Sequence, residues 1–220
     1  MHQWDLIEIP YDDDVNTDIR QDNSPIFYYI LLVIDCATRY KDFVFLTSKS
    51  RSEVAEAFKS IYNNPNNPLS WPRLAQCDEG REFMGSVTLL IGLYNIKIRR
   101  IKAHFRHTSL AMVDRYAGLF EYRVFKNQYS VEFLLPTGER CRECERFARR
   151  IVDNMNDTPT RLIEMSPNNA TKLERIYSKP SVKYNHPIDD SGPQRPFVRE
   201  QLMHIKEEPM LPPRWVLEDN

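Results

Sequence analysis

The order of the apolar segments most constrains the fold of this chain. Five segments are rich in Ile, Val, Phe and Tyr, or are short and apolar, as β-strands are; they lie at 4–9, 26–35, 41–48, 73–78 and 96–103. Helical spacing of apolar residues occurs at 50–63 and 86–95, before the fourth and the fifth strand. Three strands followed by alternating helices and strands predict an α/β fold, with a five-stranded mixed sheet flanked by helices.

The remaining sequence predicts a helical extension and a proline-rich tail. Residues 111–135 and 143–156 have helical patterns, and a Pro-Thr-Gly turn separates them. Seven of the 15 prolines follow Tyr177, which is typical of an extended or disordered segment. We therefore expect three parts: a core at 1–130, a helical extension at 131–177 and a tail at 178–220.

Composition excludes several classes of protein. The 30 Lys and Arg residues nearly balance 31 Asp and Glu residues, so any basic binding surface must be local. The longest apolar run, at 26–34, is shorter than the roughly 20 residues that a membrane-spanning helix needs. The first residues also lack the pattern of a signal peptide. Cys141 and Cys144 form a Cys-x-x-Cys pair without a second ligand pair at zinc-finger spacing, so we expect no structural zinc there.

Three aspartates stand where carboxylates are able to do chemistry. Asp5 lies within the first strand, where a buried charge is costly unless it is paired or binds a metal. Asp78 ends the fourth strand, where α/β sheets present active-site groups. Asp114 lies in the first turn of the helix that begins near 111. Each has an ordinary structural interpretation by itself, and only the combination indicates a site.

This combination resembles the catalytic core of retroviral and retrotransposon integrases, which belong to the ribonuclease H-like superfamily. The Asp-x-Gly-x-Glu-Phe signature of that family is matched by Asp78, Gly80, Glu82 and Phe83. Between Asp78 and Asp114 stand 35 residues, as in the family. The resemblance covers roughly 3–125. The segment at 158–170 is more similar to the integrases of Maverick or Polinton-type DNA transposons.

The resemblance implies a metal-dependent polynucleotidyl transferase, or endonuclease, that acts in DNA integration and recombination. Asp5, Asp78 and Asp114 would be catalytic and would hold two Mg²⁺ or Mn²⁺ ions, with Asp5 and Asp78 on the shared ion. Water or a DNA 3′-hydroxyl would then attack a phosphodiester. The implied partners are element-end and target DNA and further copies of the chain. A nuclear location follows from the DNA substrate, and no membrane is implied.

The chain departs from the family pattern in several places. Asp114 stands where integrases have Glu, although mariner-type transposases use three aspartates. Glu79 and Ala117 stand where the family has Asn. We find neither the family's His-His-Cys-Cys motif before the core nor a basic module after it, so we expect a fragment or a chain without its DNA-end-binding parts. The alternative interpretation is a catalytically inactive, domesticated nucleic-acid-binding protein with the same fold.

A basic run accompanies the fifth strand. Five basic residues and no acidic residue occur between 97 and 106. One interpretation is contact with DNA phosphates beside the metals, and the other is an edge strand protected by charge. The residues expected to bind DNA are Lys97, Arg99, Arg100, Lys102, Arg106, His107 and Arg115.

Overall fold

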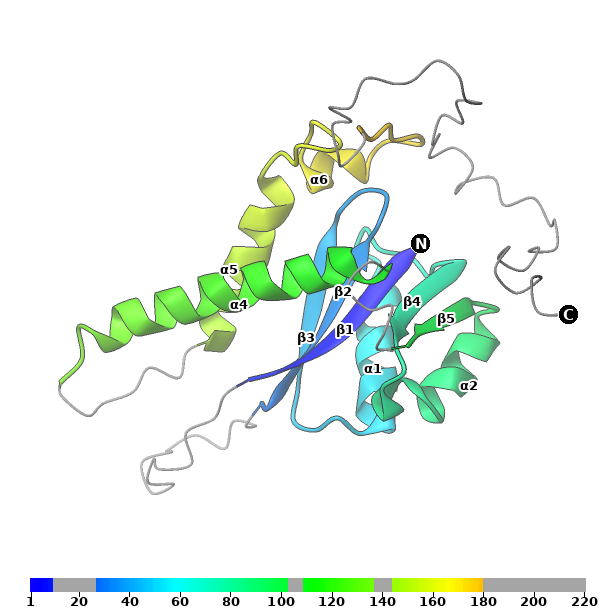
Figure 1. Cartoon of the computed structure of the whole chain (residues 1–220), viewed down its shortest axis with the longest axis horizontal. Coiled ribbons are helices and arrows are strands. Elements are labelled where there is room, and N and C mark those ends of the chain that lie inside the picture. Colours follow the sequence, from blue (N-terminus) through cyan, green and yellow to red (C-terminus); the bar gives the residue numbers. More distant parts are fainter. Residues whose placement is uncertain (10–26, 103–108, 137–143, 180–220) are drawn as a thin grey trace, which may run out of the picture. The chain divides into compact units, whose positions relative to one another are not determined.

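The five expected strands are present in the computed structural model, which describes residues 1–9, 27–102, 109–136 and 144–179 (Figure 1). The strands are β1 (His2–Glu8), β2 (Tyr29–Asp35), β3 (Lys41–Leu46), β4 (Leu74–Asp78) and β5 (Lys97–Ile101). The helices are α1 (Arg51–Tyr62), the short 3₁₀ helix η2 (Arg81–Phe83), α2 (Ser86–Leu93), α4 (Ala111–Glu132), α5 (Cys144–Asp157) and α6 (Pro167–Ala170). The predicted order of strands and helices is confirmed. Nearly all of the expected tail lies outside the described residues, and the boundary expected near 130 stays a prediction.

The sheet is mixed, as the sequence predicts, with strand order β3-β2-β1-β4-β5. The first three strands form an antiparallel meander, whereas β4 runs parallel to both β1 and β5. β1 is therefore central, and it pairs with β2 along its whole length. Its pairing with β4 is limited to His2 with Ala75 and Gln3 with Gln76.

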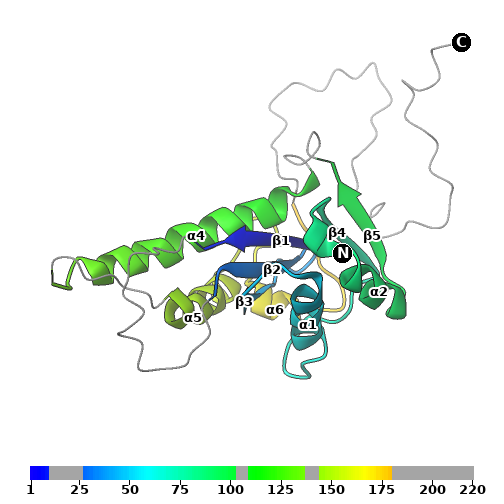
Figure 2. The same ribbon diagram turned by 90° about the horizontal axis from the view of Figure 1, so that it is seen from below.

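Alternate side chains of the central strands face two different helical layers. On one face, Trp4 and Val33 pack in a core with α1 and α2. On the other face, Leu32 and Phe43 pack against α4 and α5. α4 runs alongside β1 and continues beyond the strands at its C-terminal end (Figures 1 and 2). Across the described ranges, we find no helix with the length and apolarity needed to cross a membrane.

α5 covers the edge strand β3 through polar side chains. The Asn156 amide, only 2% exposed, donates to the Lys41 carbonyl at 2.8 Å and accepts from the Lys41 N–H at 3.0 Å. It thus pairs with the strand edge much as a neighbouring strand would. Arg149 forms an ion pair of 2.8 Å with Asp42, which places α5 firmly on β3.

Candidate functional site

The three predicted aspartates lie on adjoining elements: Asp5 on β1, Asp78 at the end of β4 and Asp114 in the first turn of α4. The parallel register pairs Gln3 with Gln76, and Asp5 and Asp78 each follow two residues later, beyond the last paired position. Side chains two residues apart in a strand point to the same face. Asp5 therefore shares a face with Gln3, and Asp78 shares that face with Gln76.

A buried amide joins this face of the sheet to the start of α4. Gln3 is 3% exposed, and its Nε2 donates to Gln76 Oε1 at 3.0 Å and to the Ser109 carbonyl at 2.7 Å. Its Oε1 accepts from the Val113 N–H at 3.1 Å. Val113 immediately precedes Asp114, so the helix turn that carries the third aspartate lies directly over Gln3.

The sequence analysis missed Gln3 and Gln76. A signal was present, because the chain has Gln-x-Asp twice, at 3–5, where the first predicted strand begins at 4, and at 76–78, within the fourth. A polar amide two residues before an aspartate, on the same strand face, is unusual in a buried sheet and requires hydrogen-bond partners. Only the strand register shows that the two amides are partners of each other.

Each of the strand aspartates accepts a hydrogen bond from nearby backbone. The Leu6 N–H donates to Asp5 Oδ1 at 2.9 Å, and the Gly80 N–H donates to Asp78 Oδ1 at 3.0 Å. Asp5 is 9% exposed, and Asp78 and Asp114 are half-buried. These are hard oxygen donors of the kind that Mg²⁺ and Mn²⁺ bind, so the chemistry of the donor set fits such ions.

Within the described part of the chain, no group of three or more His, Cys, Asp or Glu side chains is arranged to hold one metal ion. The predicted arrangement requires two aspartates on the shared ion and the third on the other ion. The identity of the metal ligands therefore stays a prediction.

The signature residues after Asp78 hold the loop in place. A side chain at Gly80 would collide with the Glu82 carboxylate, so glycine lets that carboxylate fold back against the loop. Phe83 is fully buried in the core formed with α1 and α2. Arg100 adds a hydrogen bond of 2.8 Å from Nη2 to the Phe83 carbonyl. Phe83 thus has a structural reason for its identity, and Gly80 leaves room for the Glu82 carboxylate.

The basic run of β5 is divided between the two faces of the sheet. Arg99 is paired with Gln76, so it lies on the face that carries the aspartates, and Lys97 shares that face. Both side chains are exposed. Arg100 points to the other face, where it also donates to Thr88 Oγ1 of α2 at 2.8 Å. The guanidinium of Arg100 therefore binds η2 and α2, which the prediction of DNA contact did not anticipate.

The other residues predicted to bind DNA are only partly described. Lys102 and Arg115 are exposed. Arg106 and His107 lie outside the described residues. β5 is an edge strand, as the alternative interpretation of the basic run requires. Contact with DNA stays a prediction for all of these residues.

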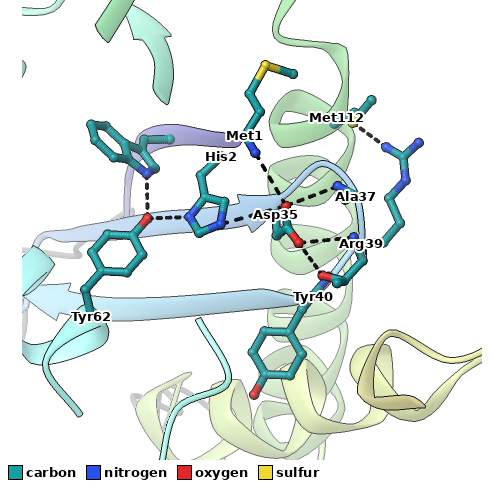
Figure 3. A network of polar contacts seen from close by, with 10 residues as sticks. Met1, His2, Asp35, Ala37, Arg39, Tyr40, Tyr62 and Met112 are labelled. Atoms are coloured by element: carbon teal, nitrogen blue, oxygen red, sulfur yellow. Dashed lines mark hydrogen bonds and ion pairs between the residues drawn. The ribbon is translucent and has the colours of Figure 1, made fainter. Parts of the chain in front are cut away.

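A second buried polar cluster lies on the opposite face of β1 (Figure 3). The Tyr62 hydroxyl accepts from Trp4 Nε1 at 2.9 Å and forms a second hydrogen bond, of 2.8 Å, with His2 Nδ1. Burial lowers the pKa of His2 to about 4, although the Asp35 carboxylate, 3.8 Å from His2 Nε2, acts in the opposite direction. Burial raises the pKa of Asp35, but His2 and hydrogen bonds from the following turn, chiefly from Thr38, reverse this and lower it. This cluster was also missed by the sequence analysis.

Cys77, next to Asp78, is a buried free thiol. Burial raises the pKa of the Cys77 thiol to about 12, so this neighbour of Asp78 is protonated at neutral pH. Among the described residues there is no disulfide bond. Cys141 lies outside those residues, so the predicted absence of zinc at the Cys-x-x-Cys pair stays a prediction.

Comparison with known proteins gives structural matches only. No family model matches the sequence, and no curated protein does. In the simian T-cell lymphotropic virus intasome in complex with the PP2A regulatory subunit B56 gamma, one chain matches with a TM-score of 0.59 at 12% identity. That match covers 83% of this chain, which spans 58% of the intasome chain.

Two structures of the HTLV-2 integrase catalytic core domain in complex with magnesium also match. The trimeric form gives a TM-score of 0.54 at 13% identity, covering 77% of this chain and 94% of that one. The dimeric form gives a TM-score of 0.54 at 12% identity, and the match covers 78% of this chain and 94% of that one. The finer resemblance to Maverick or Polinton integrases stays a prediction. At these identities the likeness concerns the fold, and this chain has the ribonuclease H-like fold of a retroviral integrase catalytic core.

Proposed function

We propose that the chain is an integrase-type polynucleotidyl transferase that joins DNA strands at Asp5, Asp78 and Asp114. The observation that carries the proposal is the Gln3 amide, which links β1, β4 and the first turn of α4, the three elements that bear these aspartates. Carboxylates from three separate elements would have a clear use in phosphoryl transfer, in which positioning and electrostatics do most of the work.

Each aspartate has a separate task in this proposal. Asp5 and Asp78, on adjacent parallel strands, would hold one Mg²⁺ or Mn²⁺ ion, and Asp114 would hold the second. When bound, the ions supply the positive charge that steadies the attacking and leaving oxygens of an in-line displacement. Arg99 and Lys97, exposed on the same face, bind phosphates of the DNA backbone and hold the scissile bond near the carboxylates.

The structural neighbours support the wider assignment. The HTLV-2 core domains were solved with magnesium, in dimeric and trimeric forms, and the simian virus chain is part of an intasome. We propose by analogy that this chain uses a divalent ion, binds element-end and target DNA, assembles with further copies of itself and works in the nucleus as part of a transposable element.

The test is a strand-joining reversal assay on a branched oligonucleotide with Mn²⁺. We expect Asp78→Asn to lower the rate by more than about 100-fold, because metal-held charge stabilisation is worth several kcal/mol. Asp153→Asn makes the same chemical change at an exposed position on α5 and is expected to keep the parental rate. Equal activity in the parent and in Asp78→Asn would show that the site is wrong.

The alternative function is nucleic-acid binding without catalysis. It is favoured by Glu79 and Ala117, which stand where the family pattern has Asn. It predicts that the parent is inactive, that calorimetry detects no Mn²⁺ binding, and that DNA binding falls steeply with salt but does not depend on divalent ions. That combination of results would refute the enzymatic proposal and support nucleic-acid binding without catalysis.

A further inference from the structure

We infer that Gln3 is a positioning residue for the metal site, acting together with Gln76. The inference rests on the proposed function at the same three aspartates. Gln3 would touch neither metal nor DNA in this role. It would set how far the two strand aspartates lie from each other and from the aspartate on α4.

The surroundings of Gln3 fix the orientation of its amide. On one side lies the Val113 N–H, which is only able to donate, and on the other lies the Ser109 carbonyl, which is only able to accept. Gln3 Oε1 must therefore face Val113, and Nε2 must face Ser109. The second N–H of Nε2 is then left for Gln76 Oε1. One amide thus forms three hydrogen bonds in a site where it is 3% exposed.

Gln3 also acts as the N-terminal cap of α4. The N-cap residue Leu110 has an apolar side chain and forms no side-chain cap bond to the described residues. Val113 is the third residue of the helix, and its N–H is one that a capping side chain commonly accepts. Here the cap comes from β1, 110 residues earlier in the chain. The start of α4 is thereby bound directly to the sheet.

Two of the three hydrogen bonds end within two residues of an aspartate. Gln3 stands two residues before Asp5 and Gln76 two residues before Asp78, and Val113 precedes Asp114. β1 and β4 pair only at two positions, both before the aspartates, so the backbone ladder does not fix the spacing further along. The amide pair lies at the last of these positions. It is therefore well placed to set the distance between the two strand carboxylates.

Few side chains are able to replace this glutamine. Met has nearly the same shape but forms none of the three bonds. Glu keeps an acceptor for Val113, but as a carboxylate it has no donor for Ser109 or for Gln76. Replacement should therefore loosen the placement of the aspartates even where the core stays filled.

The experiment compares Gln3→Met with a matched control, Asn156→Ala. Asn156 is a similarly buried amide with two long-range hydrogen bonds, but it binds β3, on an element that carries none of the three aspartates. The readouts are the Mn²⁺ dissociation constant by calorimetry and the Mn²⁺ concentration that gives half-maximal strand-joining reversal. Circular dichroism and thermal melting establish that each variant folds.

We expect Gln3→Met to weaken Mn²⁺ binding by about 10- to 100-fold, the usual effect of removing groups that orient metal ligands, and to raise the half-maximal Mn²⁺ concentration equally. Asn156→Ala should lower the melting temperature and leave both metal readouts unchanged. A folded Gln3→Met with parental Mn²⁺ affinity would overturn the inference, as would an equal loss of affinity in Asn156→Ala.

A second variant keeps the inference testable if Gln3→Met does not fold. Gln76→Met removes only the bond between the two strands and leaves the cap on α4 in place. We expect it to weaken Mn²⁺ binding by about 10-fold, and parental affinity in this variant would contradict the inference. A parent chain that neither binds Mn²⁺ nor acts would instead refute the proposed function, so the two failures are distinguishable.

Discussion

The buried neutral state of His2 predicts that the protein loses stability as the pH falls from 7 to 4. In the folded chain, burial lowers the pKa of His2 from 6.5 to about 4. In the unfolded chain, His2 has its ordinary pKa of 6.5. Between these two values, the unfolded state takes up a proton that the folded state does not, so the free energy of unfolding falls with pH.

The size of this effect follows from the two pKa values. Each unit of difference corresponds to about 1.36 kcal/mol, so a change from 6.5 to about 4 gives a loss of about 3 kcal/mol by pH 4. This loss is negligible well above pH 6.5 and grows no further once the pH is well below 4. The lowered pKa of Asp35 also makes acid destabilising, but mainly below the ordinary value of 3.8, and so largely outside this window.

The assay is urea denaturation at several pH values from 7 to 4, on the parent and on His2→Gln. Glutamine does not titrate, and its side chain is able to accept from the Tyr62 hydroxyl. Other groups that titrate in this range do so in both proteins, so the difference between the two curves isolates His2. We expect the parent to lose about 3 kcal/mol more than the variant. Parallel curves would refute the conclusion that His2 is neutral in the folded protein.

Two further predictions concern the signature loop and the basic strand. Phe83→Ala should lower the free energy of unfolding by about 3–5 kcal/mol in urea denaturation, because Phe83 is fully buried, whereas Leu93→Ala, at an 82% exposed position, should change it by less than about 0.5 kcal/mol. Equal losses would contradict the anchoring of the loop by Phe83. Arg99→Gln should reduce the slope of log DNA affinity against log salt by about 1, as expected for one lost phosphate contact. Arg100→Gln should leave that slope unchanged and lower the free energy of unfolding, since the Arg100 guanidinium binds η2 and α2. An equal change of slope in both variants would contradict the assignment of DNA contact to Arg99 and of a structural role to Arg100.

Much of the fold was predictable because it depends on local patterns. The strand that ends at Asp78 and the helix that carries Asp114 follow from the period of their apolar residues. The elements that carry the three aspartates follow from those same patterns. The separation of the basic residues onto the two faces of β5 was harder to predict from the sequence. The sequence shows Lys97, Arg99 and Arg100 as one charged stretch, and only the alternation of side chains in β5, with its place at the sheet edge, separates Arg100 from the other two.

The polar contacts of the candidate site depend on register, which local patterns do not specify. Gln3 and Gln76 are 73 residues apart, and nothing in either segment states that they meet. The same holds for the cluster of His2, Tyr62 and Asp35, which joins three elements on the opposite face of β1. In both clusters the sequence supplies a polar residue in an apolar strand, and the partner is known only once the strands and helices are placed.

The spacing of 35 residues between Asp78 and Asp114 is therefore not sufficient to make a site. A spacing along the chain sets no distance in space, because β5 and the segment after it lie between the two residues. The start of α4 meets the sheet through the buried apolar residues Leu110 and Val113, and the Gln3 amide adds bonds to Ser109 and Val113 at this point. If Gln3 positions the metal site as we infer, a related chain that kept all three aspartates but lost this amide would retain the sequence signature and bind Mn²⁺ more weakly. On that inference, the two glutamines are a further sequence marker of the site, beside the acidic spacing.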